Sequence, residues 1–207
     1  ADLVKILPSS YDQIYARWYI KWRDGYNFND HNHGGGLHAG GRQYLGRSDY
    51  RPAGDDWFSA WIEPDVNTHT LYSYSYYRGM YMNCADPSGS CWGDMFPCTT
   101  DEGRTFCEKP EHREQFLPDE LEDNRWYCVE MFLDGGVATS NEANATGKLN
   151  FWVDGVEMGA WDNLWFRTND NIKINTLWLN LFHHGEHSPA GVMYDHVAVS
   201  TQRIGCY

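Results

Sequence analysis

The stretch WFSAWIEPDVNTHTLYSYSYY, residues 57 to 77, decides the fold because it has the pattern of two β-strands joined by a turn. Strict alternation in its first half puts two sets of side chains on opposite faces of a strand: Phe58, Ala60 and Ile62 on one, and Trp57, Ser59, Trp61 and Glu63 on the other. Residues 64 to 68 are rich in turn formers, and the run after them alternates Tyr72, Tyr74 and Tyr76 with Leu71, Ser73 and Ser75. The sequence therefore predicts an antiparallel hairpin with one apolar face and one face of aromatic rings and hydroxyl groups.

The aromatic face of this hairpin has the chemistry of a saccharide-binding surface. Indole and phenol rings cover the apolar faces of pyranoses, while the hydroxyl groups of Ser59 and the tyrosines can meet those of a sugar. The alternative is that aromatic residues stand here only because strands favour them. The alternation alone leaves both interpretations open.

Length, composition and charge narrow the class of protein. The chain has 207 residues, of which 42% are hydrophobic and 16% aromatic, which fits one large all-β domain. No apolar run approaches the ~20 residues of a membrane-spanning helix, and the N-terminus does not resemble a signal peptide, so we expect a mature chain with no membrane partner. The net charge of -13 argues against nucleic acid as a partner. An anionic polysaccharide would need a local cluster of basic residues within this repelling field, so neutral glycans remain an alternative.

Six cysteines predict disulfides in a secreted, extracellular protein. Four of them crowd into a segment rich in Gly, Ser, Pro and Asp: Cys84, Cys91, Cys98 and Cys107. Zinc is the less favoured alternative because its sites use closer cysteine pairs. We expect these four to pair among themselves and Cys128 to pair with Cys206. The sequon Asn144-Ala145-Thr146 permits glycosylation in a eukaryotic host.

Further strands are expected along the rest of the chain, at residues 13 to 23, 125 to 134, 148 to 158, 174 to 184 and 191 to 205. Asp154-Gly155 is a hairpin signal within the third of these. Helical periodicity and internal repeats are absent, so the sequence predicts a β-sandwich over residues 1 to 207. Residues 79 to 125 form a long disulfide-rich loop, which we interpret as a lid or rim that two cross-links stabilise in place of a core.

Several polar residues are candidates to line a groove. Arg17, Tyr19 and Lys21 share one face of the first of these strands, and Trp178 and Asn180 share a face of the strand at 174 to 184. The glycine-rich loop HNHGGGLHAGGRQ, residues 31 to 43, is a second candidate wall. Its three histidines invite a metal hypothesis, but hydrogen-bonded histidine is the favoured interpretation. The motif HHGEH at 183 to 187 lacks the H-E-x-x-H order of a zinc site, so we expect His184 or His187 to be a hydrogen-bond partner or proton carrier at the groove edge.

Short motifs along most of the chain resemble concanavalin A-like jelly-roll proteins, most closely family 14 polysaccharide lyases that act on alginate or glucuronan. The motifs are ARWYIKW, GGGLHAGG, WFSAWIEP, the Tyr-x-Tyr strand, WGDMF, NRWYCVE, FWVDG and YDHVAVSTQRIG. This resemblance implies a two-sheet antiparallel jelly-roll β-sandwich whose concave sheet grips an extended polysaccharide. It also implies β-elimination, in which a base removes the C5 proton of a uronate, a cation or amide stabilises the enolate, and an acid protonates the leaving oxygen.

The resemblance places its site residues one by one. Ser59 is kept, and the tyrosine pair matches Tyr72 and Tyr74. The family's lysine falls at Gly36, however, and its arginine at Trp61, so two cations are absent from their expected places.

Three functions follow from these residues. The first is a divergent secreted lyase in which Tyr72 or Tyr74 transfers the proton, His38 or His184 shares the role of base, and the lost cations are replaced by Arg17, Lys21 or Arg42. The second is a carbohydrate-binding module or lectin in which Trp61 is a stacking platform. The third is a glycoside hydrolase, for which Glu63 and Glu130 are the candidate carboxylates. We expect a monomer that binds a polysaccharide or oligosaccharide and requires no cofactor, with a structural calcium ion left open.

Overall fold

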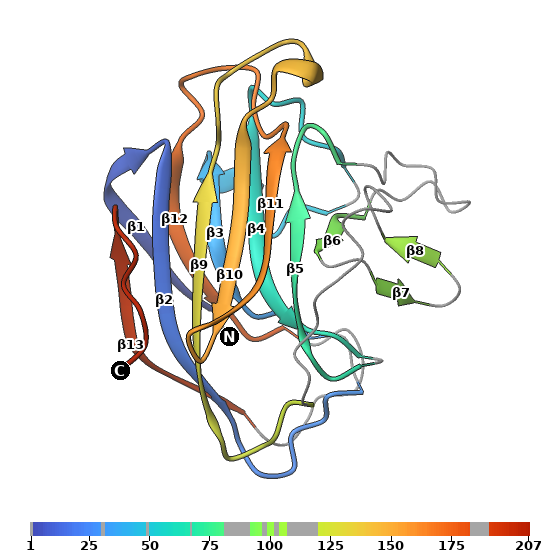
Figure 1. Ribbon diagram of the computed structural model, residues 1–207, viewed down its shortest axis with the longest axis vertical. Helices are drawn as coiled ribbons and strands as arrows, with labels where there is room; N and C mark the ends of the chain where they lie inside the picture. The colour runs from blue at the N-terminus through green and yellow to red at the C-terminus, as the bar shows by residue number, and fades with distance from the viewer. Residues whose placement is uncertain are drawn as a thin grey trace.

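Two antiparallel β-sheets pack face to face in the protein, as the sequence predicts (Figure 1). The computed structural model describes residues 2–29, 32–48, 50–66, 68–80, 92–96, 99–101, 104–106, 120–182 and 191–207. No helix in these ranges is long and apolar enough to cross a membrane. The all-β sandwich is therefore confirmed for the described part of the chain.

The larger sheet has six strands and carries the predicted hairpin of residues 57 to 77. Its order is β1 (Asp2–Tyr11), β12 (Ile174–Asn180), β3 (Gly35–Gly40), β4 (Trp57–Pro64), β5 (Leu71–Tyr76) and β6 (Asp94–Phe96). The predicted hairpin is confirmed as β4 and β5, which pair with Trp61 opposite Tyr74. The turn between them is held by Asp65, whose carboxylate accepts the backbone N–H of Thr68 at 2.8 Å.

The second sheet has five strands in the order β11 (Val156–Leu164), β10 (Gly147–Val153), β9 (Trp126–Asp134), β2 (Gln13–Trp22) and β13 (Val192–Ser200). Asp154 and Gly155 join β10 to β11, and both have positive φ, as the predicted two-residue turn requires. Two short strands, β7 (Thr99–Asp101) and β8 (Arg104–Phe106), form a separate ribbon. The 3-10 turns are η1 (Arg42–Tyr44) and η3 (Glu142–Asn144).

The hydrophobic core lies between the two sheets. On β2 the predicted apolar face is confirmed, since Ile14, Ala16, Trp18, Ile20 and Trp22 are all buried. The six-stranded sheet meets them with alternate residues of its inner strands, which include Leu37, Phe58, Ala60, Ile62, Leu177 and Leu179. Period-two alternation thus sets which side chains enter the core.

The glycine-rich segment differs from its prediction as a loop that walls a cleft. Residues 35 to 40 are strand β3, which lies between β12 and β4. Glycine is needed here because the chains approach closely: a Cβ atom on Gly35 would lie 2.7 Å from Leu179 and 2.9 Å from Trp18. The glycines of β3 have no side chains, so the strand lacks a clear alternation of polar and apolar residues. The sequence pattern therefore did not predict a strand here.

One predicted disulfide is confirmed. Cys128 of β9 is bonded to Cys206, and their Cα atoms are 6.0 Å apart. The other four cysteines, and the lid or rim role expected for most of residues 79 to 125, lie outside the described residues.

Candidate functional site

The outer face of the six-stranded sheet carries the residues that were expected to bind a saccharide. Residues paired across neighbouring strands share a face, so Trp178, Gly36, Trp61 and Tyr74 form one row across four strands. A second row holds Thr176, His38, Ser59 and Tyr76, and a third pairs Glu63 with Tyr72. The structure therefore brings together six of the residues singled out in the sequence: His38, Ser59, Trp61, Tyr72, Tyr74 and Trp178.

This outer face is buried, which the alternation pattern did not predict. Ser59 and His38 are fully buried, and the exposed fraction of Trp61, Tyr72 and Tyr74 does not exceed 5%. Part of the cover comes from the segment around η1: the Tyr44 ring stacks on Trp57 with centroids 6.1 Å apart, and Gly46 lies against the indole of Trp178. The face is an aromatic layer packed beneath covering segments, and not an open groove.

Gly36 and Trp61 replace the two cations implied by the family resemblance, and they do so as a packed pair. They lie opposite each other on β3 and β4. A Cβ atom built on Gly36 would collide with Cδ1 of Trp61 and with the carbonyl oxygen of Ala60. The indole therefore occupies the space above the glycine, and a residue with a side chain does not fit at position 36.

Tyr74 is held in its neutral form. Its hydroxyl group lies 2.9 Å from that of Tyr76 and accepts the backbone N–H of Gly93 at 3.1 Å. Burial raises the pKa of Tyr74 well above its usual value of 10.0, and the neighbouring Tyr76 raises it further. A phenol in this environment can donate a proton but does not ionise to act as a base near neutral pH.

His38 is also neutral, and it belongs to a group of buried polar atoms. Burial lowers the pKa of His38 to about 4, against the weaker opposing effect of the Gly41 carbonyl group. The Nε2 atom lies 3.3 Å from the Gly41 carbonyl oxygen, which can only accept, so the proton resides on Nε2. Within the described residues four atoms of this region have no hydrogen-bond partner: Nδ1 of His38, Oγ of Ser59, and Nε1 of Trp57 and Trp61.

A chain of three polar side chains crosses one end of the same face. Nδ1 of His33 lies 3.0 Å from Oε1 of Glu63, and the hydroxyl group of Tyr72 donates to Oε2 of Glu63 at 3.3 Å. Glu63 is completely buried, whereas 20% of the His33 side chain is exposed. Burial alone would lower the pKa of His33, but the charge and hydrogen bond of Glu63, with a smaller effect of Asp2, raise it above 6.5.

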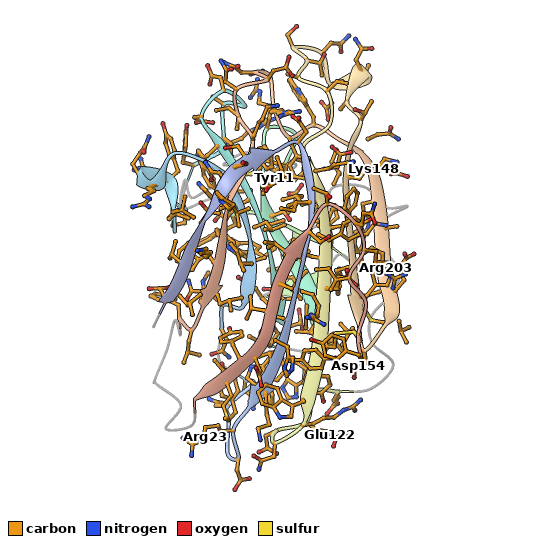
Figure 2. The ribbon with its side chains drawn as sticks, turned by 90° about the vertical axis from the view of Figure 1, so that its left-hand side faces the viewer. Tyr11, Arg23, Glu122, Lys148, Asp154 and Arg203 are labelled. Carbon is orange, nitrogen blue, oxygen red and sulfur yellow. A yellow bond between two sulfur atoms is a disulfide. The ribbon has the colours of Figure 1, made fainter. Side chains whose placement is uncertain are left out.

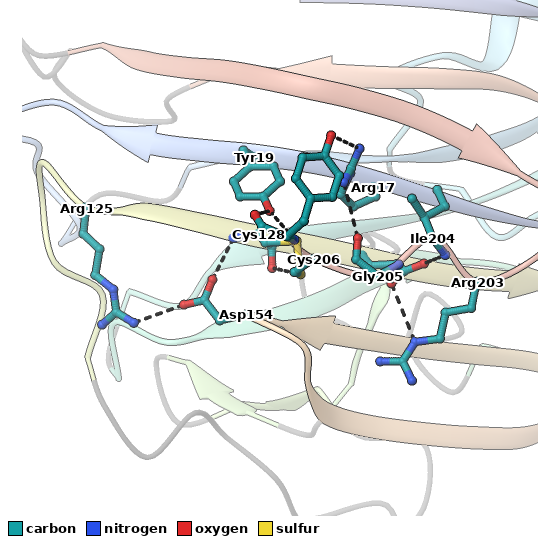
Figure 3. Close-up of a disulfide and its surroundings, with 11 residues drawn as sticks. Arg17, Tyr19, Arg125, Cys128, Asp154, Arg203, Ile204, Gly205 and Cys206 are labelled. Atoms are coloured by element: carbon teal, nitrogen blue, oxygen red, sulfur yellow. Dashed lines mark hydrogen bonds and ion pairs between the residues drawn. A yellow bond between two sulfur atoms is a disulfide. The ribbon is translucent and has the colours of Figure 1, made fainter.

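Arg17, Tyr19 and Lys21 lie apart from this face because β2 belongs to the five-stranded sheet. Figure 2 separates the two layers and shows Arg203 and Lys148 on the outer side of that sheet. There the C-terminal tail crosses the strands: Arg17 donates to the carbonyl oxygen of Gly205 at 3.3 Å, and Tyr19 donates to that of Tyr207 at 2.6 Å (Figure 3). The chain's own C-terminal tail therefore binds two of these candidate groove residues, Arg17 and Tyr19.

The remaining candidates are spread over the molecule. Arg42 is exposed at the start of η1, and Asn180 is half-buried at the end of β12. His184 lies outside the described residues. Glu63 and Glu130, proposed above as a hydrolase pair, are separated because β4 and β9 belong to different sheets. In the described ranges no three metal-ligating side chains gather into a metal site.

Sequence reasoning missed the part played by His33 and Phe182. From the sequence, His33 was considered only as one of three histidines in a loop. In the structure its backbone N–H donates to the carbonyl oxygen of Phe182 at 3.0 Å. This hydrogen bond connects the segment before β3 to the end of β12. The Phe182 ring lies edge-on to the His33 imidazole with centroids 5.4 Å apart and is 53% exposed. The alternation of Phe182 with the leucines of β12 was the available signal.

Comparisons with known proteins agree with the fold. No family model and no curated protein sequence matches the chain. Among solved structures, the chain is similar to the alginate lyase Aly36B (TM-score 0.64, 12% identity, 96% of this chain and 73% of that one) and to alginate lyase vAL-1 from Chlorella virus (0.61, 14%, 92% and 72%). It is also similar to the endo-β-1,4-glucuronan lyase of the fungus Trichoderma reesei (0.55, 17%, 98% and 74%). The protein therefore has the jelly-roll fold of alginate and glucuronan lyases, at low sequence identity.

Proposed function

We propose that this protein binds an uncharged glycan at the rim of the outer face of its six-stranded sheet and does not cleave it by β-elimination. The packing of Trp61 over Gly36 carries this proposal, because it places an indole and a glycine where the resembling lyases have an arginine and a lysine. β-Elimination needs positive charge beside the uronate carboxylate to stabilise the enolate. None of the residues in the three rows is a lysine or an arginine, and Glu63 neutralises the charge of the neighbouring His33.

The overall charge points in the same direction. A net charge of -13 repels a uronate polymer and has no effect of this kind on a neutral one. The solved structures to which the chain is similar include a lyase bound to an alginate trisaccharide, which supports a carbohydrate as the class of ligand. The Cys128–Cys206 disulfide fits an oxidising compartment, and we infer a secreted, extracellular protein that acts as a monomer.

A divergent polysaccharide lyase is the second candidate. The alternate positions of Tyr72 and Tyr74 on β5 and the retained Ser59 on β4 favour it, because they match the family pattern. In this alternative Tyr74 would protonate the leaving oxygen, since burial keeps its hydroxyl group protonated near neutral pH.

A panel of polysaccharides tests both candidates. Neutral glucans, mannans and xylans and the uronate polymers alginate and glucuronan are each assayed for binding, and for the ultraviolet absorbance of unsaturated products. Binding of a neutral polymer without new absorbance supports the proposal, whereas a rise in absorbance on any uronate polymer overturns it in favour of the lyase.

Two matched substitutions identify the binding face. Trp178→Phe changes an indole on the outer side of the six-stranded sheet, and Trp126→Phe changes one on the five-stranded sheet. Trp178→Phe is expected to weaken binding, since Nε1 of Trp178 donates to Asp2 at the rim of the face. An equal loss of affinity in Trp126→Phe would indicate that the ligand binds the five-stranded sheet, which would contradict this proposal.

A further inference from the structure

A chain of polar side chains leads from the buried aromatic layer to the surface: Tyr72 donates a hydrogen bond to Glu63, and Glu63 forms an ion pair with His33. Glu63 and Tyr72 are paired on β4 and β5 and are buried, so the carboxylate has a fixed position. His33 stands at the outer end of the chain with one fifth of its side chain exposed. An imidazole whose Nδ1 atom is paired with a buried carboxylate has a set orientation.

Phe182 lies beside this imidazole as an exposed ring. It is 53% exposed although it contacts His33 both through its ring and through its carbonyl oxygen. Exposed aromatic rings fixed at a surface are suited to stack on the apolar face of a sugar. Asn180 is two residues before Phe182 at the end of β12, and its Oδ1 atom has no hydrogen-bond partner among the described residues.

The charges around His33 favour an uncharged ligand. Glu63 faces it from β4 and Asp2 from β1, and both raise the pKa of His33. The phenols of Tyr72 and Tyr74 on β5 and of Tyr194 on β13 also lie near Glu63, and burial raises the pKa of Tyr74 and of Tyr194. A protonated imidazole here donates a charge-assisted hydrogen bond to a hydroxyl oxygen, whereas a carboxylate ligand would meet two carboxylates.

We propose that His33 and Phe182 form a sugar subsite at the rim of the six-stranded sheet, in which Phe182 stacks on a neutral pyranose and His33 donates a hydrogen bond to one of its hydroxyl groups. Glu63, oriented by Tyr72, is the positioning residue that keeps His33 protonated and aimed at the sugar. The inference rests on the glycan-binding function proposed above and adds the two side chains that contact the sugar.

Calorimetric titration with neutral hexasaccharides tests this subsite, with cellohexaose, mannohexaose and xylohexaose as probes and an oligoglucuronate as the charged comparison. Because His33 loses its proton as pH rises through its raised pKa, the affinity for a neutral probe is expected to fall about tenfold between about pH 6 and about pH 9. His33→Gln is expected to remove this pH dependence and weaken binding about tenfold at the lower pH. Phe182→Ala is expected to weaken binding by a similar factor at both pH values.

His196→Gln is the matched control. His196 is another exposed histidine paired with a carboxylate, 3.2 Å from Asp195, but it lies on β13 of the other sheet. It is expected to leave affinity and its pH dependence unchanged. Phe182→Ala covers the case in which His33→Gln fails to fold, since Phe182 is largely exposed.

The possible results distinguish failure of the subsite proposal from failure of the proposed glycan-binding function. If a neutral probe binds and the His33 and Phe182 variants keep the wild-type affinity and pH profile, the subsite is wrong and glycan binding stands. If no neutral probe binds the wild-type protein, both proposals fall.

Discussion

Trp61 lies directly over Gly36 on the neighbouring strand, and its indole fits there because residue 36 has no side chain. A side chain at position 36 would meet backbone as well as indole: a Cβ atom there would collide with the carbonyl oxygen of Ala60 and lie 2.7 Å from Cα of Trp61. Backbone atoms of a central strand cannot move aside without disturbing the ladder on both sides. The glycine is therefore required by the sheet itself and not only by the tryptophan.

Gly36→Ala is accordingly expected to destabilise the protein by about 1–3 kcal/mol, the usual range for overpacking. Trp61→Ala in the same chain is not expected to restore stability, because the clash with the backbone remains. Denaturant unfolding measures both variants. Gly191→Ala is the control, since a Cβ atom there has no neighbour within 4 Å. Full rescue of Gly36→Ala by Trp61→Ala would contradict the packing described here.

The buried His38 makes stability depend on pH below neutrality. Its pKa is 6.5 in the unfolded chain and about 4 in the fold, so the unfolded state takes up the proton first as pH falls. The contribution is complete above pH 6.5 and is lost progressively toward pH 4, by roughly 3 kcal/mol in all.

The measurement compares the free energy of unfolding of the wild-type protein and His38→Gln from neutral pH to about pH 4. The variant is expected to show the shallower loss, since it lacks the group that titrates. Parallel curves for the two proteins would mean that His38 is accessible to protons in the fold.

The Cys128–Cys206 disulfide closes a loop of 78 residues in sequence separation. Replacing both cysteines by serine is expected to lower the free energy of unfolding by about 2–4 kcal/mol, because the unfolded chain regains the freedom that the cross-link removes. The double variant is the right test, since a reducing agent would act on every cysteine of the chain. Unchanged stability would indicate that the contacts of the tail fix its position without the covalent bond.

Glu130 holds the same tail by a different interaction. Its carboxylate accepts the backbone N–H groups of Ile204 at 2.6 Å and Gly205 at 3.0 Å, and its side chain is 1% exposed. Glu130→Gln replaces one acceptor oxygen by a donor and is expected to cost about 1–3 kcal/mol.

Hydrogen exchange reports this change locally. The amides of residues 204 and 205 are expected to exchange faster in Glu130→Gln, while those of β4 in the other sheet keep their protection. Glu157→Gln is a control on β11, two strands away in the same sheet, where the side chain is exposed. Uniformly faster exchange would instead show that Glu130 supports the whole fold.

The sequence predicted those parts of the fold whose side chains alternate. On β2 every second residue from Ile14 to Trp22 is apolar and buried, so period-two reasoning found both the strand and its inner face. The same reasoning failed for β3, because Gly35 and Gly36 have no side chain to alternate. It did not single out β1 either, an edge strand that contains Pro8 and has mostly exposed side chains.

The sequence predicted which residues make up the candidate site but not which segments cover it. Alternation on β4 and β5 places Ser59, Trp61 and Tyr74 on one face, which the structure confirms. It cannot reveal what covers that face, because cover comes from segments distant in sequence, such as the one that carries Tyr44. Arg17 and Lys21 were predicted to line the groove for a similar reason. The sequence indicated their strand but not the order of strands in the sheets.

The burial of β4 on both faces has a consequence for how this fold can change. Every residue from Trp57 to Pro64 is buried, so the strand has no side on which a substitution meets only solvent. Opening a groove lined with cations would require new residues on β3 and β4 and a different course for the segments above them, all at once. Single substitutions in this strand test stability before they test function, and the residues at the rim are where ligand preference can vary while the fold persists.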